Sequence, residues 1–213
     1  MSSRITRFIL LLIVGIALTF GLLSLNVPMW LTVVIIFLFY MAFSIGWPFF
    51  IIYKTRSVKM VDRYISGHRR KPIFGYSYAL AHGTDEDVIS WLKAIIDRYP
   101  QKEMQEVYQG NLAIFERDPK ALFRHAEQMT PSEYRVYFLA LAHIMKKEID
   151  RAEIYKEKLQ TPWTRHMIDA SIAHRLKDLP ALEEAIDRAV QSTRGLQRYS
   201  LYHTGERMKK EIK

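Results

Sequence analysis

Residues 8–53 read FILLLIVGIALTFGLLSLNVPMWLTVVIIFLFYMAFSIGWPFFIIY and contain no Asp, Glu, Lys, Arg or His. Two apolar runs, Phe8–Leu25 and Met29–Tyr53, are separated only by the tripeptide Asn26-Val27-Pro28. At a helical rise of ~1.5 Å per residue the runs extend ~27 Å and ~37 Å, and a bilayer has a hydrocarbon core of ~30 Å. The stretch therefore predicts two membrane spans that form a tight helical hairpin.

A cleaved signal peptide is the alternative interpretation of the first run, which follows the basic residues Arg4 and Arg7. The run is longer than the usual apolar core of a signal peptide, and no small-x-small cleavage pattern follows Leu25. We therefore expect an uncleaved span that acts as part of a membrane anchor.

The formal net charge of +9 is concentrated beside the apolar stretch. Residues 54–71 hold seven basic residues and one acidic residue, whereas residues 72–213 carry a balance of only +1. Because basic residues close to the ends of spans are retained in the cytoplasm, we expect the N-terminus and the C-terminal domain to be cytoplasmic. A folded domain of nearly zero net charge also argues against nucleic acid as the partner.

The basic residues that follow the second run predict contact with anionic lipid headgroups, at about 1 kcal/mol per residue near the surface. The residues concerned are Arg56, Lys59, Arg63, Arg69, Arg70 and Lys71. The alternative is that these charges serve only to orient the protein in the membrane.

Two pairs of small residues indicate where the membrane helices approach other helices. Ala17 and Gly21 in the first run, and Ala42 and Gly46 in the second, are spaced four residues apart, and small residues let helix backbones pack closely within a bilayer. We interpret the pairs as packing within the hairpin, with a partner's membrane helix as the alternative. Pro48 is expected to kink the second span. The spans contain no charged residue, which argues against an ion pathway.

Beyond the hairpin, apolar periodicity predicts helices and no sheet. The chain divides into a leader (1–7), the two-span hairpin (8–53), a basic juxtamembrane helix and linker (54–72) and a helical-repeat domain (73–213). A short amphipathic helix is predicted at 57–66. In the last part, first and second helices of successive pairs are predicted in alternation at 73–82, 85–99, 102–117, 120–129, 132–148, 151–159, 163–177, 181–192 and 196–210.

A period of about 31 residues organises this domain. Pro100, Pro131 and Pro162 are spaced 31 residues apart, and each precedes a predicted first helix. Small residues recur in register, in the first helices at Gly110, Ala140 and Ala170 and in the second helices at Ala121, Ala152 and Ala181. Two helices per unit at this period are typical of stacked helical hairpins. The expected fold is therefore an all-α solenoid that follows a transmembrane hairpin.

The repeated small residues, the prolines that close each unit and the pair Tyr134 and Tyr137 resemble the pattern of tetratricopeptide repeats, over residues 73–210. The resemblance implies a right-handed superhelix with a concave groove, lined by the first helices, that binds peptides or other proteins. By position in the resembled repeat, the groove residues are Tyr108, Arg135, Leu139, Trp163 and His166.

The same resemblance bears on the ligand and on the end of the array. Arg135 stands where the family often keeps a cation for an acidic peptide or a C-terminal carboxylate. The last segment, with Arg207, Lys209, Lys210 and Lys213, is expected to be a polar capping helix. Whether the groove is open or filled by this helix is left open by the sequence.

The residues that usually carry catalysis or bind metals are not arranged for either role. The chain has no cysteine, and no nucleophile, phosphate-loop or dinucleotide motif is present. His82, His143 and His174 occupy matching positions, but helices of stacked units lie ~10 Å apart, too far to share an ion with bonds of ~2 Å. Carboxylates such as Glu183 and Glu184 lie near helix N-termini, where dipole compensation explains them. We therefore predict no catalytic, cofactor-binding or metal-binding residue.

These features favour a membrane-anchored scaffold or adaptor of the bacterial inner-membrane type, whose cytoplasmic repeat domain binds a protein partner. One alternative is an accessory subunit of a membrane transporter or membrane enzyme, bound through the transmembrane hairpin. Another is a regulator that responds to lipids through residues 54–71. An enzyme is not expected.

Overall fold

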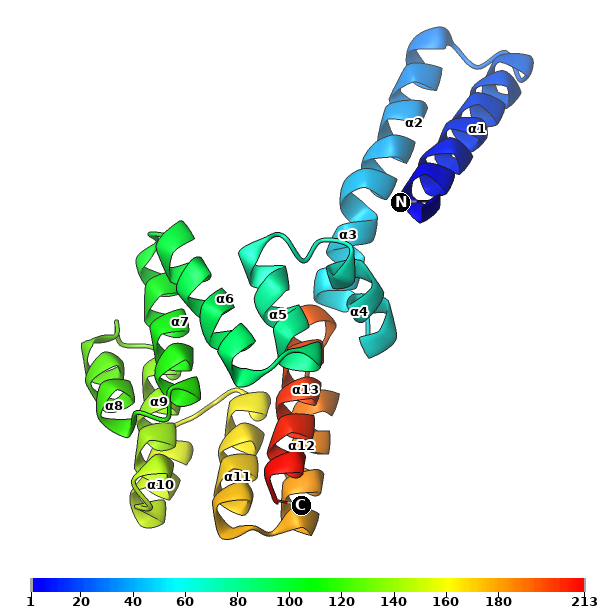
Figure 1. Ribbon diagram of the computed structural model, residues 1–213. Coiled ribbons are helices and arrows are strands. Elements are labelled where there is room, and N and C mark those ends of the chain that lie inside the picture. Colours follow the sequence, from blue (N-terminus) through cyan, green and yellow to red (C-terminus); the bar gives the residue numbers. More distant parts are fainter. Residues whose placement is uncertain (1, 213) are drawn as a thin grey trace. The chain divides into compact units, whose positions relative to one another are not determined.

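The computed structural model describes residues 2–212, which form helices and no strand (Figure 1). The chain splits into two compact units, an N-terminal unit at Met1–Ile51 and a C-terminal unit at Ile52–Lys213. The all-α class expected from the sequence is therefore confirmed for the described residues.

The N-terminal unit contains the apolar helices. Helix α1 covers Ser2–Ser24, and a second helical stretch begins with α2 at Met29–Met41 and ends at Lys54. The stretch Met29–Lys54 has 26 residues, or about 39 Å of helix, and its apolar side chains are mostly exposed. This one helix is long and apolar enough to cross a membrane. The apolar part of α1, Ile9–Ser24, is shorter.

Pro48 interrupts the regular winding of this long helix, as expected for a residue without a backbone N–H. The backbone N–H of Trp47 donates to the carbonyl of Ala42, five residues earlier. Wider π-helical turns, η1 (Ala42–Gly46) and η2 (Phe50–Lys54), therefore flank the short α-helical turn α3 (Trp47–Phe49) that carries Pro48. Such widened turns are a usual cause of local irregularity in helices.

The close approach of α1 and α2 is made at Gly15, where a Cβ atom would overlap the hydroxyl of Tyr40. Asn26, with a left-handed φ of 54°, follows the end of α1. The four small residues interpreted as hairpin packing, Ala17, Gly21, Ala42 and Gly46, are all exposed. The close contact between α1 and α2 is therefore made by a glycine that was not among the four predicted small residues.

The C-terminal unit begins with the juxtamembrane helix α4 (Val58–Ser66), which is capped by Ser57 and followed by Gly67 as expected. The remaining helices agree with the expected boundaries to within three residues. They are α5 (Pro72–His82), α6 (Asp85–Arg98), α7 (Lys102–Phe115), α8 (Pro119–Gln128), α9 (Glu133–Met145), α10 (Ile149–Lys156), α11 (Pro162–Leu176), α12 (Leu179–Gln191) and α13 (Gly195–Ile212).

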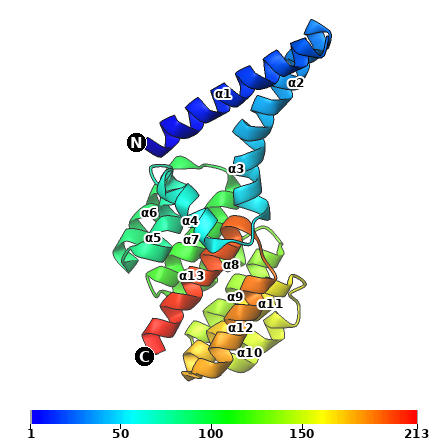
Figure 2. The ribbon, with the colours of Figure 1, turned by 90° about the vertical axis from the view of Figure 1, so that its right-hand side faces the viewer.

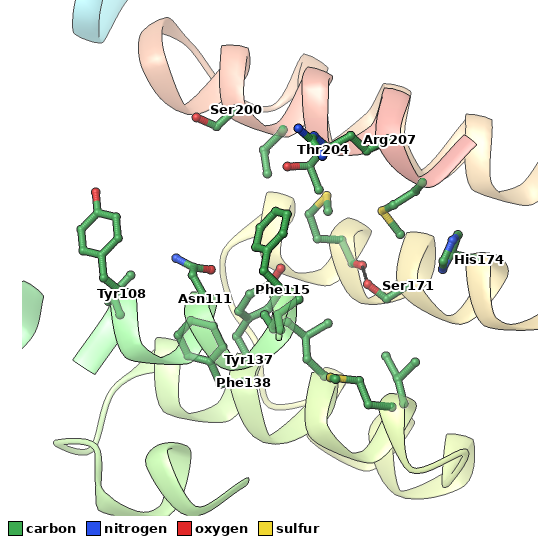
Figure 3. A pocket seen from close by; sticks show the side chains of 18 of the residues that line it. Tyr108, Asn111, Phe115, Tyr137, Phe138, Ser171, His174, Ser200, Thr204 and Arg207 are labelled. Atoms are coloured by element: carbon green, nitrogen blue, oxygen red, sulfur yellow. Dashed lines mark hydrogen bonds between the residues drawn. The ribbon is translucent and has the colours of Figure 1, made fainter. Parts of the chain in front are cut away.

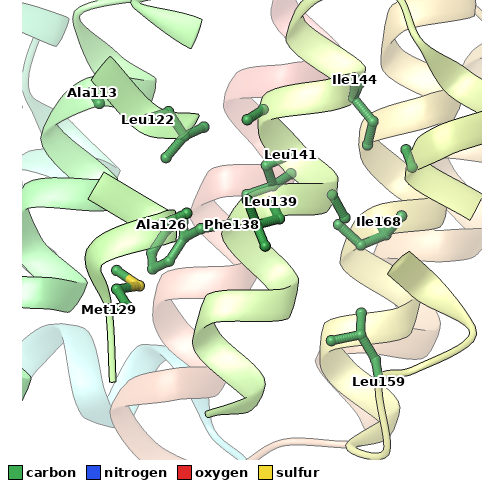
Figure 4. Packing of buried hydrophobic residues seen from close by; sticks show 13 residues of the cluster. Ala113, Leu122, Ala126, Met129, Phe138, Leu139, Leu141, Ile144, Leu159 and Ile168 are labelled. Atoms are coloured by element: carbon green, nitrogen blue, oxygen red, sulfur yellow. The ribbon is translucent and has the colours of Figure 1, made fainter. Parts of the chain in front are cut away.

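Helices α5 to α12 pack against their neighbours along the chain, and α9 also packs against α11. One large apolar cluster, built from α7 to α11, includes Leu122, Phe138 and Ile168 (Figure 4), and Ala140 also belongs to it. The small residues predicted in the first helices, Gly110, Ala140 and Ala170, are buried, and a Cβ at Gly110 would meet the ring of Phe138. Small side chains are therefore used where helices approach closely.

Local capping explains several helix starts. Thr84 and Asp87 form a reciprocal capping box at the start of α6. Asp118 accepts hydrogen bonds from the first turn of α8, which begins with Pro119. Thr161 precedes Pro162 in the same way, but its hydroxyl does not cap α11 and instead donates to Glu133.

Two acidic side chains connect successive helix pairs. One lies near the start of α7 and binds the segment that precedes α9, and the other lies at the start of α9 and binds the segment at the start of α11. Glu106 accepts hydrogen bonds from the backbone N–H and the hydroxyl of Thr130. Glu133 accepts from the N–H groups of Gln160 and Thr161 and from the hydroxyls of Thr161 and Thr164. Thr130 and Thr161 directly precede two of the spaced prolines, Pro131 and Pro162. The Thr-Pro pairs are thus anchoring points between successive helix pairs.

The last helix, α13, corrects the expectation of a polar cap. It packs against α12 and α11 and also against α4 and α5, at the other end of the unit's sequence (Figure 2). Tyr199, Leu201 and Gly205 are buried in these contacts. At its start, Gly195 has a left-handed φ of 57° and donates its N–H to the Thr55 carbonyl at 2.7 Å.

Among the described side chains of α13, Arg207 makes the largest number of hydrogen bonds. Its guanidinium donates to the carbonyls of Ala79 (2.8 Å), Leu80 (2.8 Å) and Gly83 (2.6 Å), and it pairs with the carboxylate of Asp85 at 2.6 Å. These carbonyls form the C-terminal end of α5, where the helix dipole favours a cation. Arg207 was expected on a polar capping helix, and the structure instead places its guanidinium at the C-terminal end of α5.

We predict that Arg207→Met lowers the free energy of unfolding by about 2–4 kcal/mol, because three carbonyls and one carboxylate lose a shared donor. Arg207→Lys should recover only a minor part, since an ammonium lacks the planar fork. The measurement is denaturant unfolding of the full chain in detergent.

The matched control is Arg188→Met, which breaks an exposed ion pair between Arg188 and Glu184 within α12. This change should alter the free energy of unfolding by less than about 0.5 kcal/mol. Equal effects of the two methionine variants would contradict the role assigned to Arg207.

We also predict a pH dependence that comes from Glu133. Burial raises the pKa of Glu133, but the hydrogen bonds from Thr161, Thr164 and Gln160 outweigh it and hold the pKa below its usual value. A carboxyl with a lowered pKa stabilises the fold above its unfolded pKa, near 4.5, and this contribution is lost as the pH falls through the folded pKa. Glu133→Gln should therefore flatten the fall in stability below about pH 4.5. The measurement is the free energy of unfolding as a function of pH, and Glu183→Gln, at an exposed position, serves as the control. If Glu133→Gln leaves the pH dependence of this free energy unchanged, the role assigned to Glu133 is refuted.

Candidate functional site

A cavity of about 830 Å³ lies inside the C-terminal unit (Figure 3). One wall is formed by α5, α7, α9 and α11, which are the predicted first helices, and the opposite wall is formed by α13. Helices α6 and α8 contribute only one residue each, Asp85 and Pro119. The predicted first helices and the last helix therefore border the space from opposite sides.

Aromatic and aliphatic side chains dominate the cavity wall. Tyr76, Tyr108, Tyr137 and Trp163 come from four different helices. Phe115 projects from α7 toward α13 (Figure 3). Burial raises the pKa of Tyr108 to about 12 and raises the pKa values of Tyr76 and Tyr137 further. These phenols are therefore neutral at physiological pH, and the wall they form is apolar with hydroxyl tips.

The uncharged polar groups of the cavity stand on opposite sides. Tyr108 and Asn111 on α7 lie across the space from Ser200 and Thr204 on α13 (Figure 3). Ser171 of α11 uses its hydroxyl within its own helix, to the Met167 carbonyl. The cavity thus offers a few hydrogen-bonding groups in a largely apolar surface, which is the usual character of a binding site.

The charged groups at the cavity are engaged with one another or lie at its edge. Arg207 uses four hydrogen bonds on the C-terminal end of α5 and on Asp85. Glu211 lies 3.2 Å from His174 and 3.6 Å from Arg117, and Arg175 is exposed. An occupant with exposed charge would therefore meet no dedicated partner within the walls.

The structure brings together two of the five residues that the resemblance assigned to a groove. Tyr108 and Trp163 line the cavity, whereas Arg135, Leu139 and His166 do not. Leu139 is only 7 % exposed and belongs to the core. His166 lies 3.8 Å from Asp169 on its own helix.

The rotation of α9 about its axis explains this difference. Its cavity side is formed by Tyr134, Tyr137, Phe138 and Leu141, a spacing that defines one face of a helix. Arg135 lies one residue, or about 100°, away from Tyr134 on the helix. The cation expected to hold an acidic peptide is therefore not part of the cavity wall.

The cavity residues of α13 were missed because the segment was interpreted as polar. Gln197, Ser200, Thr204 and Met208 recur every three or four residues on the side that faces the cavity. This spacing is that of one face of a helix. The small hydroxyl side chains at two of the four positions are the local signal that could have indicated a cavity beside this face.

The six basic residues expected at lipid headgroups, Arg56, Lys59, Arg63, Arg69, Arg70 and Lys71, are all exposed. They lie on and around α4 in the C-terminal unit. None of them forms an ion pair within residues 2–212.

The three histidines at matching positions have separate partners. His82 bonds Asp62 at 2.8 Å, His143 bonds Glu148 at 2.6 Å, and His174 contacts Glu211. Within the part of the chain that the structure describes, no cluster of three or more His, Cys, Asp or Glu side chains is arranged to hold a metal ion.

Comparisons of the chain with protein-family models, with curated proteins and with solved structures find no match. The functional argument therefore depends on the cavity, the exposed charges and the apolar helices.

Proposed function

We propose that this protein is a membrane-anchored adaptor whose helical C-terminal unit binds an apolar segment of a protein partner in the cavity. The observation that carries the proposal is the large, aromatic-lined cavity on the concave side of the predicted first helices. Its volume falls within the ~300–1,000 Å³ that is usual for binding pockets.

The anchor in this proposal consists of both apolar helices. The stretch Met29–Lys54 is long enough to cross a bilayer by itself. Helix α1 has 23 residues, or ~35 Å of helix, so a second span through α1 is part of the proposal. The basic residues on both sides of the hairpin support a topology with the N-terminus and the C-terminal unit in the cytoplasm.

The chemical groups of the cavity wall indicate how polar a fitting partner segment would be. The phenols are neutral, and Arg207, Asp85 and Glu211 are engaged with other side chains or with the backbone. An apolar segment with one or two hydrogen-bonding groups fits this wall better than the acidic peptide that Arg135 suggested. Helix α13 forms one wall of the cavity, so the segment would be held between α13 and the predicted first helices.

The test is to fill the cavity from its α13 side. Ser200 lines the cavity and its Oγ makes no hydrogen bond within the described residues, so Ser200→Trp should place an indole in the space. A photo-crosslinking amino acid at Gln197, also in the wall, would capture the occupant in the native membrane. We expect adducts with a partner protein that fall at least tenfold in Ser200→Trp.

Ser90→Trp is the matched control, because Ser90 is exposed on α6, away from the cavity lining. It should leave the adducts unchanged. Peptide adducts that persist in Ser200→Trp, or adducts with lipid alone, would overturn the proposal. Thermal unfolding of both tryptophan variants shows whether the fold is retained.

A second candidate function is an accessory subunit bound through its membrane helices. It is favoured by the exposure of Gly21 and Gly46, where an added Cβ would meet no atom within 4 Å. These positions, together with the exposed Ala17 and Ala42, offer close packing to another helix in a bilayer.

For this candidate, we predict that Gly21→Leu combined with Gly46→Leu releases a multi-span partner during gentle detergent extraction. The fold itself should tolerate the leucines, since both sites are open. Gly15→Leu is the contrasting variant, because it would disrupt α1 against Tyr40. Retention of every co-purifying membrane protein in the double variant would argue against this function.

A further inference from the structure

The six exposed cations beside α4 form what we call the basic surface: Arg56, Lys59, Arg63, Arg69, Arg70 and Lys71. The only contact of their charged groups that the structure gives is that of Arg69, which lies 5.9 Å from the ring centre of Tyr78. Residues 54–71 carry a net charge of +6 out of +9 for the whole chain. The positive charge of the protein is thus gathered on a short segment and left uncompensated.

Helix α4 is held by its apolar side, which leaves its basic side outward. Val61 and Ile65 are 1 % and 0 % exposed, and α4 packs against α5 and α13. Lys59 and Arg63, one turn apart, are exposed. A free amphipathic helix would offer its apolar face to a membrane, but here that face is already used by the protein.

The one acidic residue of the segment, Asp62, is turned toward the protein. Its carboxylate accepts a hydrogen bond from the hydroxyl of Tyr199 at 2.7 Å and lies 2.8 Å from Nε2 of His82. Both partners belong to the helices on which α4 packs, α13 and α5. Asp62 therefore fixes α4 and does not neutralise the neighbouring cations.

The turn after α4 is also held in place. Tyr64 and His68 stack at 4.4 Å, and Phe74 meets Tyr64 edge-on at 5.8 Å. Nδ1 of His68 lies 2.8 Å from the Tyr64 carbonyl. The cations at 69–71 are thus carried on a folded turn next to α4 rather than on a loose linker.

The basic surface directly follows the apolar helix in the chain, and this position favours the bilayer as its partner. Arg56 follows the end of the apolar helix Met29–Lys54 by two residues, a distance of at most ~7 Å along an extended chain. Any bilayer that holds this helix therefore lies within reach of Arg56, the first residue of the basic surface. Clusters of four to eight basic residues directly after a membrane helix are suited to anionic lipids.

We propose that the basic surface is a docking site for the anionic headgroups of the bilayer that holds the apolar helix. The proposal rests on the anchoring part of the proposed function. It goes beyond a signal for orientation, because the fold presents the charges on a fixed surface of the C-terminal unit. Docking would keep that unit against the membrane instead of leaving it free on its tether.

The experiment uses the full chain in lipid nanodiscs. Because the protein has no cysteine, Ser66→Cys at the exposed end of α4 accepts a single fluorophore. Quenching by a headgroup-labelled lipid then reports the distance of α4 from the bilayer surface. The discs contain phosphatidylcholine alone or phosphatidylcholine mixed with phosphatidylserine.

We expect stronger quenching in discs with phosphatidylserine, and loss of the difference at 1 M salt, where the Debye length is about 3 Å. The variant Lys59→Gln/Arg63→Gln/Arg70→Gln should shift the equilibrium away from docking by on the order of a hundredfold. Its matched control is Lys120→Gln/Arg124→Gln/Arg165→Gln, which removes the same number and kinds of exposed cations elsewhere and should retain the quenching.

The two faces of a nanodisc are equivalent, so an effect of the charges on membrane orientation does not influence the result. Equal quenching in neutral and anionic discs would overturn the proposal, as would equal losses in the two triple variants. Failure of the wild-type chain to enter discs at all would instead contradict the anchor. The two proposals are therefore distinguished by different outcomes.

Discussion

The C-terminal unit depends on the contact between the Arg207 guanidinium and the C-terminal end of α5. Helices that pack mainly on their neighbours in sequence form an array with two free ends. Arg207 joins the last helix to the first helix pair, and Asp85 completes the contact from the start of α6. With α13 held there, the cavity gains the wall that faces the predicted first helices, and α4 gains α13 as a packing partner.

The features that the sequence predicted well are those with local causes. Helix starts follow from capping residues and prolines such as Thr84 and Pro119, which act within one turn. The apolar periodicity of each segment acts over three or four turns. The expected boundaries therefore agree with the observed helices, and the length of the second apolar run identified the helix that is able to cross a membrane.

The features that the sequence did not predict depend on distant partners or on rotation about a helix axis. The contacts of Arg207 join residues 122–128 positions apart, and no local pattern marks them. Whether Tyr137 or Leu139 faces the cavity depends on a rotation of about 200° along α9, and the resemblance alone left that rotation undetermined. The spacing of small residues likewise predicted helix contacts in the apolar segment. That the close contact between α1 and α2 occurs at Gly15 depends on the position of the Tyr40 side chain, which the spacing does not give.

The long sequence separation between α4 and α13 has a consequence for biosynthesis. Tyr199 follows Asp62 by 137 residues, so at ~5–20 residues per second a ribosome needs about 7–27 s to make the partner that holds α4. During that interval the apolar helices are complete, while the Val61 and Ile65 side of α4 has no α13 to cover it. Insertion of the nascent chain can thus precede closure of the C-terminal unit, and synthesis of α13 becomes the step that completes the fold.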